Sequence, residues 1–297
     1  MRIKKRWVKI LLLLGVFAIG VEIAVVQIYD ARFEASTPEG LVRESMETKT
    51  RWTVSYLTNE NADDSLPRVV YVHGTPGSAD AFTNYVRRPV PGLNPISIDR
   101  PGFGASTPRA PAVALVAQSI SIEPFLVERN GQWPILVGHS MGGPIIARVA
   151  ADFPDKVGGI VILSGALDPT LEKIYWYQRI GKFLFVPYML PKSIRNSNDE
   201  LYPLKGELEL LKPMLKDVTC PVVIVHAPND MLVPYANVDY MESQFKKDVI
   251  KSVVTLPEKN HFIPWNSESE IRVAIEQLHE AKNDLATISV DQNVGQP

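Results

Sequence analysis

The stretch Pro134-Ile-Leu-Val-Gly-His-Ser-Met-Gly-Gly-Pro-Ile-Ile-Ala147 joins a short apolar run to a helical pattern through Gly-x-Ser-x-Gly at 138–142. This pattern is typical of a strand, a sharp turn and a helix, in which the central serine projects from the turn. The flanking glycines are needed because strand and helix approach closely there. The stretch therefore predicts that Ser140 is a nucleophile, with the backbone N–H of Met141 and the helix N-terminus beside its hydroxyl.

Outward from this stretch, short apolar runs alternate with helical patterns. The runs are rich in Val and Ile, as strands buried on both faces are. Candidate strands lie at residues 41–47, 51–57, 68–72, 95–98, 135–137, 159–163, 222–225 and 252–256. Candidate helices lie at residues 79–86, 111–129, 142–152, 235–247 and 267–282. The alternation predicts an α/β fold, with a mostly parallel central sheet and helices on both faces.

One segment breaks the alternation, because no convincing strand lies between residues 163 and 222. We interpret residues 168–215 as a helical cap over the edge of the sheet. Within it, Trp176, Tyr177 and Phe183 are the candidate substrate-binding side chains. The alternative is an ordinary helical excursion whose aromatic side chains pack into the core. The predicted organisation is an anchor or signal segment at 1–30, a core at 31–167 and 216–282, the cap at 168–215 and a flexible tail at 283–297.

A nucleophilic serine needs a base, and the base needs an acid that orients it. Among the five histidines, His261 follows the last predicted strand and precedes the closing helix, so it lies at the same edge of the sheet as Ser140. Asp230 also follows a predicted strand and is the candidate acid. Asp168, after the preceding strand, is its competitor. For either aspartate, a role as turn or helix-cap residue is the structural alternative.

The loop after the strand at 68–72 reads His73-Gly-Thr-Pro-Gly77, so its backbone amides can face a reacting carbonyl. Pro76 has no N–H to donate. Thr75 is therefore the best donor to act with Met141 as an oxyanion hole. The alternative is a glycine-rich turn of purely structural purpose. A second turn, from Asp99 to Gly104, is assigned a structural role.

Charge is distributed unevenly along the 297-residue chain, whose formal net charge is −2. Five cations fall in the first nine residues, which leaves the rest of the chain clearly negative and argues against a nucleic-acid partner. The one cysteine, Cys220, has no internal disulfide partner and precedes an apolar run, so a buried thiol is expected. Cysteine content therefore does not decide the redox compartment.

The basic cluster is followed by an apolar segment at 10–28, interrupted by Glu22 and Gln27. Nineteen residues suffice to cross a bilayer, whereas the uncharged run at 10–21 suits the core of a signal peptide. We favour an uncleaved membrane anchor, with cleavage after Gly20 and secretion as the alternative. The positive-inside rule places the N-terminus in the cytoplasm and the body on the non-cytoplasmic side, which is periplasmic or extracytoplasmic in a bacterium.

Together these residues resemble the α/β-hydrolase family, in its branch with a serine nucleophile and a cap between the sixth and seventh strands. The resemblance spans roughly residues 66–282. It rests on the order of the His73-Gly74 loop, Asp99-Arg-Pro-Gly-Phe-Gly-Ala-Ser106, the turn at 138–142, Asp230 in Asn-Asp-Met-Leu-Val-Pro234 and His261 in His-Phe-Ile-Pro-Trp265.

The resemblance implies a Ser140–His261–Asp230 triad, an oxyanion hole from Thr75 and Met141, and no metal or organic cofactor. Epoxide hydrolases and haloalkane dehalogenases of this family carry an aspartate at the turn, so Ser140 argues against those two activities. The expected function is hydrolysis of carboxylic esters or related small acyl compounds through an acyl-enzyme. The alternatives are hydrolysis of a carbon–carbon bond in a diketone-like substrate, and a binding protein that has lost turnover.

Overall fold

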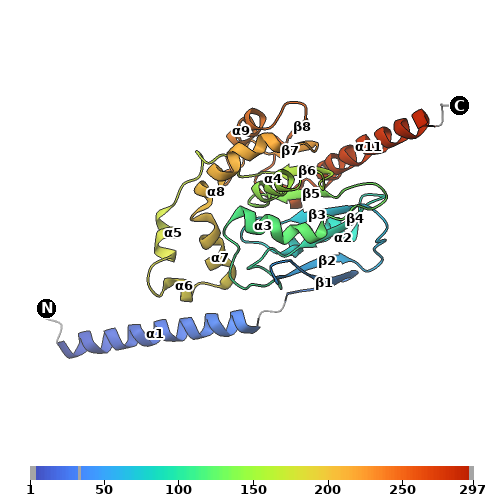
Figure 1. Ribbon diagram of the computed structural model, residues 1–297. Coiled ribbons are helices and arrows are strands. Elements are labelled where there is room, and N and C mark those ends of the chain that lie inside the picture. The colour runs from blue at the N-terminus through green and yellow to red at the C-terminus, as the bar shows by residue number, and fades with distance from the viewer. Residues whose placement is uncertain (1–4, 33–34, 294–297) are drawn as a thin grey trace.

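A computed structural model describes residues 5–32 and 35–293 (Figure 1). Its sheet has the order β1-β2-β4-β3-β5-β6-β7-β8. β1 and β2 pair antiparallel, β2 pairs antiparallel with β4, and the remaining neighbours are parallel. The strands are β1 Leu41–Glu47, β2 Thr53–Asn59, β3 Arg68–Val72, β4 Asn94–Ile98, β5 Ile135–His139, β6 Gly159–Leu163, β7 Val222–His226 and β8 Ile250–Thr255.

Helices cover both faces of this sheet. The longer helices are α1 Lys5–Arg32, α3 Leu115–Ile122, α4 Gly142–Asp152, α7 Lys192–Leu201, α8 Leu204–Leu211, α9 Ala236–Gln244 and α11 Glu268–Asn293. The shorter ones are η1 Ala79–Phe82, α2 Thr83–Arg87, η2 Glu123–Phe125, α5 Trp176–Gly181, α6 Val186–Met189, η3 Lys212–Asp217 and α10 Ile263–Asn266. One core cluster joins the sheet to α3, α4, α8 and α9, and a second joins the other face to η1, α2 and α11.

The central strands are buried along their whole length, because helices lie on both sides of them. Every residue of β3, β4, β5, β6 and β7 is buried. Such strands show continuous apolar runs instead of alternation. The predicted α/β fold with a mostly parallel sheet is confirmed.

Two helices end at other residues than the sequence pattern predicts. The pattern at 111–129 forms α3 and then the 3₁₀ turn η2, which has Pro124 in its first turn. A proline there removes the N–H that would continue the α-helical ladder. At the other end of the chain, α11 continues past residue 282 to Asn293, into the segment predicted as a flexible tail. Residues 294–297 of that tail lie outside the described residues.

The segment between β6 and β7 forms α5, α6, α7, α8 and η3 (Figure 1). The alternative interpretation required the aromatic side chains of this segment to pack into the core, and they do not. Trp176 is 72% exposed and Phe183 is 62% exposed. The short helix α6 lies instead beside the N-terminal helix α1.

α1 is a long apolar helix with little contact to the body. Within its span Trp7–Ala31, an 18-residue window has a mean hydropathy of 2.5 and is 6% buried, so the helix meets the length and composition of a membrane-crossing helix. A signal sequence meets the same criteria. The helix touches the rest of the protein through its second half, where Val26 and Asp30 are buried.

Candidate active site

Ser140 follows β5 in a sharp turn that forces a rare backbone conformation. Its φ is +54°, in the left-handed region. A Cβ at Gly138 would lie 2.3 Å from the Gly142 carbonyl oxygen, and one at Gly142 would lie 2.2 Å from the Val72 carbonyl oxygen. Both positions therefore require glycine. The Ser140 N–H donates to the Leu163 carbonyl at 2.9 Å, which ties the turn to β6.

Asp230 and His261 meet at the carboxyl edge of the sheet. His261 Nδ1 lies 2.7 Å from Asp230 Oδ2, and both side chains are buried. The other carboxylate oxygen accepts the backbone N–H groups of Leu232 at 2.9 Å and Val233 at 2.8 Å. Burial alone would raise the pKa of Asp230, but the hydrogen bonds from His261 and Val233 outweigh it and hold that pKa below its usual value. The carboxylate is therefore fixed in position and ionised.

Ser140 and His261 line one cavity of about 250 Å³, together with Thr75 and Met141. Among the described residues, no hydrogen bond joins the Ser140 hydroxyl to the His261 ring. Such bonds are often long until substrate is bound, so the geometry is compatible with proton transfer between the two groups. The structure thus brings five sequence-predicted site residues to one cavity, Tyr177 being the fifth, with Asp230 directly behind His261.

Asp168 lies elsewhere and has a different role. Its Oδ1 accepts both the N–H and the hydroxyl of Thr170, each at 2.8 Å. This is the self-contained turn that aspartate commonly forms. Asp168 therefore matches the structural alternative considered for it, whereas Asp230 contacts the histidine.

The two expected oxyanion donors, Thr75 and Met141, both line this cavity. Neither the Thr75 N–H nor the Met141 N–H donates a hydrogen bond to another residue in the described part of the chain. Free N–H groups at a cavity wall can stabilise developing negative charge on an oxygen atom. The Thr75 side chain has a separate partner, because its hydroxyl donates to Ser197 Oγ of α7 at 2.9 Å.

A buried ion pair supports the loop that carries Thr75. Arg100 Nη1 lies 2.7 Å from Glu200 Oε1 and Nη2 lies 3.1 Å from Oε2, with both side chains fully buried. The same guanidinium donates to the carbonyls of His73 at 3.0 Å and Gly74 at 2.9 Å. The sequence assigned Arg100 to loop support, but nothing in it indicated Glu200 as the partner.

His139 is the neighbour of Ser140 in the chain and lies against His261. Its Nε2 lies 2.9 Å from the His261 carbonyl oxygen, and the two ring centroids are 4.7 Å apart. Burial, and then the neighbouring His261, lower the pKa of His139 to about 3. A neutral His139 holds the His261 backbone without placing a second positive charge beside the site. Adjacency to Ser140 was the only available signal for it.

Of the three candidate substrate-binding residues, Tyr177 lines the cavity, whereas Trp176 and Phe183 are not among its lining side chains. Sequence reasoning missed other lining residues: Ala166, Glu172, Lys173, Tyr175, Gln178, Leu201, Leu204, Met231, Leu232 and Val233. Burial, and then the charge of Asp168, raise the pKa of Glu172.

In the described part of the chain, no group of three His, Cys, Asp or Glu side chains is arranged to hold a metal ion.

Comparison with known proteins supports the architecture. A family described as alpha/beta hydrolase fold matches residues 67–185. A Danio rerio sn-1-specific diacylglycerol lipase is 25% identical over 181 residues, which are 59% of this chain and 56% of the lipase. A 2-hydroxy-6-oxononadienedioate/2-hydroxy-6-oxononatrienedioate hydrolase from Pseudomonas is 24% identical over 211 residues, 56% of this chain and 72% of that enzyme. Overall, the chain spans between about a quarter and just over half of the first curated relatives that it matches.

Among solved structures, a bacterial membrane phospholipase A is similar with a TM-score of 0.57 and 18% identity. The alignment covers 94% of this chain and 99% of that one. At this identity the likeness concerns the fold. The sequence match over residues 67–185, the sheet order and the turn at Ser140 agree, and this chain has the alpha/beta-hydrolase fold.

Proposed function

We propose that this protein is a membrane-anchored serine hydrolase that cleaves carboxylic esters or related acyl compounds. The observation that carries the proposal is the Asp230–His261 hydrogen bond of 2.7 Å behind the cavity where Ser140 is held at a positive φ. A serine in such a turn, with a histidine oriented by a buried carboxylate, is the arrangement that activates a hydroxyl for acyl transfer.

In the proposed mechanism, Ser140 Oγ attacks the acyl carbonyl carbon while His261 Nε2 takes the hydroxyl proton. The carbonyl oxygen becomes an oxyanion and accepts hydrogen bonds from the Thr75 and Met141 amides. Collapse of this intermediate breaks the bond to the leaving group, and His261 gives that group its proton. Water then attacks the acyl-enzyme with His261 as base, which releases the acid and restores Ser140.

The groups in this scheme contribute to the rate in different ways. Loss of one oxyanion donor costs about 2.7–4 kcal/mol of transition-state stabilisation. Asp230 keeps the proton on His261 Nδ1, so that Nε2 is the basic nitrogen, and its charge stabilises the imidazolium that forms. The pocket beyond Ser140 is lined by Tyr177 and by aliphatic side chains such as Leu204, which suits an apolar acyl or alcohol group.

The decisive experiment is labelling of the full-length protein in membranes with a fluorophosphonate, followed by intact-mass analysis. We expect stoichiometric labelling that is lost in Ser140→Ala. Ser164→Ala is the matched control, because Ser164 also has a positive φ, of 44°, but is fully buried and does not line the cavity. No labelling of the folded wild-type protein would refute the proposal and favour a binding protein on this scaffold.

The same mass spectrum tests the anchor. An intact N-terminus supports membrane anchoring, whereas a mass that begins after Gly20 supports secretion. Five cations in the first nine residues, ahead of the apolar segment at 10–28, favour an anchor with the body on the non-cytoplasmic side.

Carbon–carbon bond hydrolysis is the second candidate, favoured by the match to the Pseudomonas oxononadienedioate hydrolase, which covers 72% of that enzyme. It would use the same three side chains on a diketone-like substrate. Release of product from a ring-cleavage compound, without comparable ester cleavage, would replace the esterase proposal with this one.

A further inference from the structure

The cap exposes an unusual number of large apolar side chains on one short stretch, α5 to α6. We call this surface the outer cap face. Its members are Ile174, Tyr175, Trp176, Tyr177, Ile180, Phe183, Leu184, Phe185 and Tyr188, and each is at least 40% exposed. Soluble proteins rarely expose so many neighbouring apolar residues without a partner.

The outer cap face lies next to the helix that is suited to cross a membrane. α6 packs against α1, and both lie on the same side of the body (Figure 1). On the second half of α1, the less exposed positions are Ile19, Ile23, Val26 and Asp30, and this spacing forms a single helical stripe. The second half of α1 therefore faces the body, while its other sides stay exposed.

Helix geometry fixes the depth of this contact. The span Trp7–Ala31 has 25 residues, so it is about 37 Å long at 1.5 Å per residue, against a hydrocarbon core of about 30 Å. The stripe from Ile19 to Asp30 covers the last 16 Å or so of that span. It corresponds to one leaflet on the side of the body. A cap helix that packs on this stripe lies at the depth of acyl chains.

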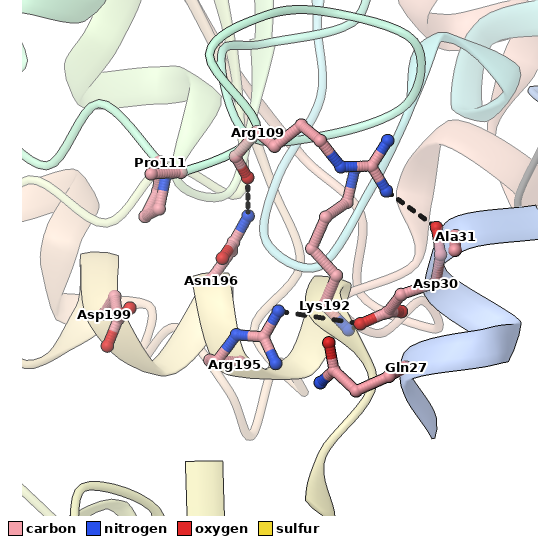
Figure 2. Close-up of a pocket in the computed structure, with 10 residues that line it drawn as sticks. Gln27, Asp30, Ala31, Arg109, Pro111, Lys192, Arg195, Asn196 and Asp199 are labelled. Carbon is pink, nitrogen blue, oxygen red and sulfur yellow. Dashed lines mark hydrogen bonds and ion pairs between the residues drawn. The ribbon is translucent and has the colours of Figure 1, made fainter. Parts of the chain in front are cut away.

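The charged residues near the end of α1 fit the same depth. Asp30 is surrounded by Arg109, Lys192 and Arg195 at a cavity of about 560 Å³ (Figure 2). Arg109 donates to the Asp30 carbonyl oxygen at 2.7 Å, and Arg195 lies 3.5 Å from its carboxylate. With Asp199 as the other lining carboxylate, the three cations leave this cavity net positive. Phosphate groups of lipids lie at this level of a bilayer and carry the complementary charge.

The outer cap face also adjoins the reactive cavity. Tyr175 and Tyr177 belong to the face and at the same time line the cavity that contains Ser140. A ligand that leaves the face toward the interior therefore meets the nucleophile without crossing the aqueous surface of the body.

We propose that the outer cap face is inserted into the leaflet around α1, and that the cavity takes an acyl-ester lipid directly from the bilayer. The inference rests on the proposed function for its chemistry and on α1 as an anchor for its geometry. The apolar side chains replace lipid contacts, and the cluster of Arg109, Lys192 and Arg195 stays at the headgroups.

Depth-dependent quenching tests the insertion without any assay of activity. In the full-length protein with Cys220→Ala, Leu184→Cys or Val273→Cys carries a bimane fluorophore. The protein is reconstituted in vesicles of three parts phosphatidylcholine to one part phosphatidylglycerol that contain acyl-chain nitroxides. Val273 is the matched control because it is 62% exposed, close to the 69% of Leu184, but lies on α11 away from α1 (Figure 1).

We expect the fluorescence at position 184 to fall at least three-fold when the nitroxide lipids are present, while that at position 273 stays unchanged. Equal and weak quenching at both positions would overturn the proposal. Strong quenching at both positions would also overturn it, because it would indicate adsorption of the whole body.

A charge placed on the face tests the route of the substrate. Leu184 has a φ of 44°, a conformation that aspartate adopts more readily than leucine, so Leu184→Asp is compatible with the fold. We expect at least a ten-fold loss of hydrolysis of diacylglycerol presented in vesicles, with hydrolysis of soluble p-nitrophenyl butyrate unchanged. Val273→Asp should change neither rate.

Equal vesicle rates for Leu184→Asp and Val273→Asp would overturn the proposed route. A different result would show that the proposed function itself is wrong. If wild-type protein hydrolyses neither substrate and shows no Ser140 labelling, the acyl-hydrolase proposal falls, and the quenching experiment still decides whether the face is inserted.

Discussion

Ser140 occupies a conformation that costs a non-glycine residue about 1–2 kcal/mol. The structure maintains it through the Ser140 N–H bond to Leu163 and through the contacts that Gly138 and Gly142 permit. Because the surrounding residues hold the turn, its conformation does not depend on the serine hydroxyl. Ser140→Ala therefore removes the proposed nucleophile while the fold persists.

Asp230→Asn is the sharpest test of the acid. Asparagine keeps an oxygen to accept the Leu232 and Val233 amides, so the loop remains folded. It cannot hold the proton on His261 Nδ1 as a carboxylate does, and we expect kcat for a soluble ester to fall about 10⁴-fold, as in a serine-protease triad. Steady-state kinetics on the purified variant measure this loss.

Asp168→Asn provides the control, because Asp168 bonds to Thr170 within its own turn. Its rate should remain within two-fold of wild type. A similar loss in both variants would remove the special role of Asp230.

Single residues also mark the limit of sequence reasoning. Ser140, His261 and Asp230 could be selected because each follows an apolar run, and parallel strands bring their carboxyl ends to one edge. Glu200 could not be selected, because its partner Arg100 is distant along the chain and no local spacing links them. Whether Trp176 or Phe183 faces the cavity depends on how α5 and the turn that follows it are oriented, which composition does not determine.

At the scale of elements, the Arg100–Glu200 pair joins α7, in the proposed cap, to the loop that carries Thr75. Glu200 also accepts a hydrogen bond from Gln118 of α3 at 2.8 Å. Glu200→Gln would leave the Arg100 guanidinium buried without a counter-charge, which costs about 3–5 kcal/mol. We expect the free energy of unfolding in urea to fall by that amount.

The neighbouring Asp199→Asn is a suitable comparison. Asp199 pairs with Lys182 at 2.7 Å, but both side chains are more than 30% exposed. Such pairs contribute about 0–1 kcal/mol, so little change is expected. If Glu200→Gln were equally mild, the buried pair would not couple the cap to the loop.

Uniform burial helped to define some strands but was not needed for all, because β1 also matches its predicted bounds although most of its residues are not buried. β3 and β6 match their predicted bounds, because an apolar run begins and ends where both faces become covered. α4 also matches, since the turn at Ser140 fixes its start. The long pattern at 111–129 was not resolved into α3 and η2, because amphipathic spacing persists through a proline that interrupts the hydrogen-bond ladder.

For the whole molecule, composition indicated a membrane-associated helix and an α/β body but not their contact. α1 and α6 pack together although they are far apart in the sequence. The sequence of each segment alone indicates only an apolar surface and does not identify what covers it. Only the folded chain shows that the stripe ending at Asp30 and the outer cap face lie together. The proposed use of lipid substrates follows from that adjacency and not from any motif.

The last prediction concerns stability against pH, because several histidines are buried in neutral form. Burial, and then Arg100, lower the pKa of His73 well below its usual value, and burial lowers the pKa of His226. His139 has a pKa of about 3. An unfolded chain protonates these rings below about pH 6.5. The folded state is therefore favoured above that pH and loses stability as the pH falls through it.

His139 alone should account for about 2 kcal/mol of the loss between pH 7 and pH 5, since each fully buried ring contributes up to about 1.4 kcal/mol per pH unit. Urea unfolding of the wild type at several pH values measures the slope. In His139→Gln, the amide can still donate to the His261 carbonyl but does not titrate, so about 2 kcal/mol of the acid sensitivity should disappear. If the free energy of unfolding changed with pH equally in the variant and the wild type, His139 would have to be protonated in the folded protein at acid pH. That result would contradict the effect of burial on its pKa.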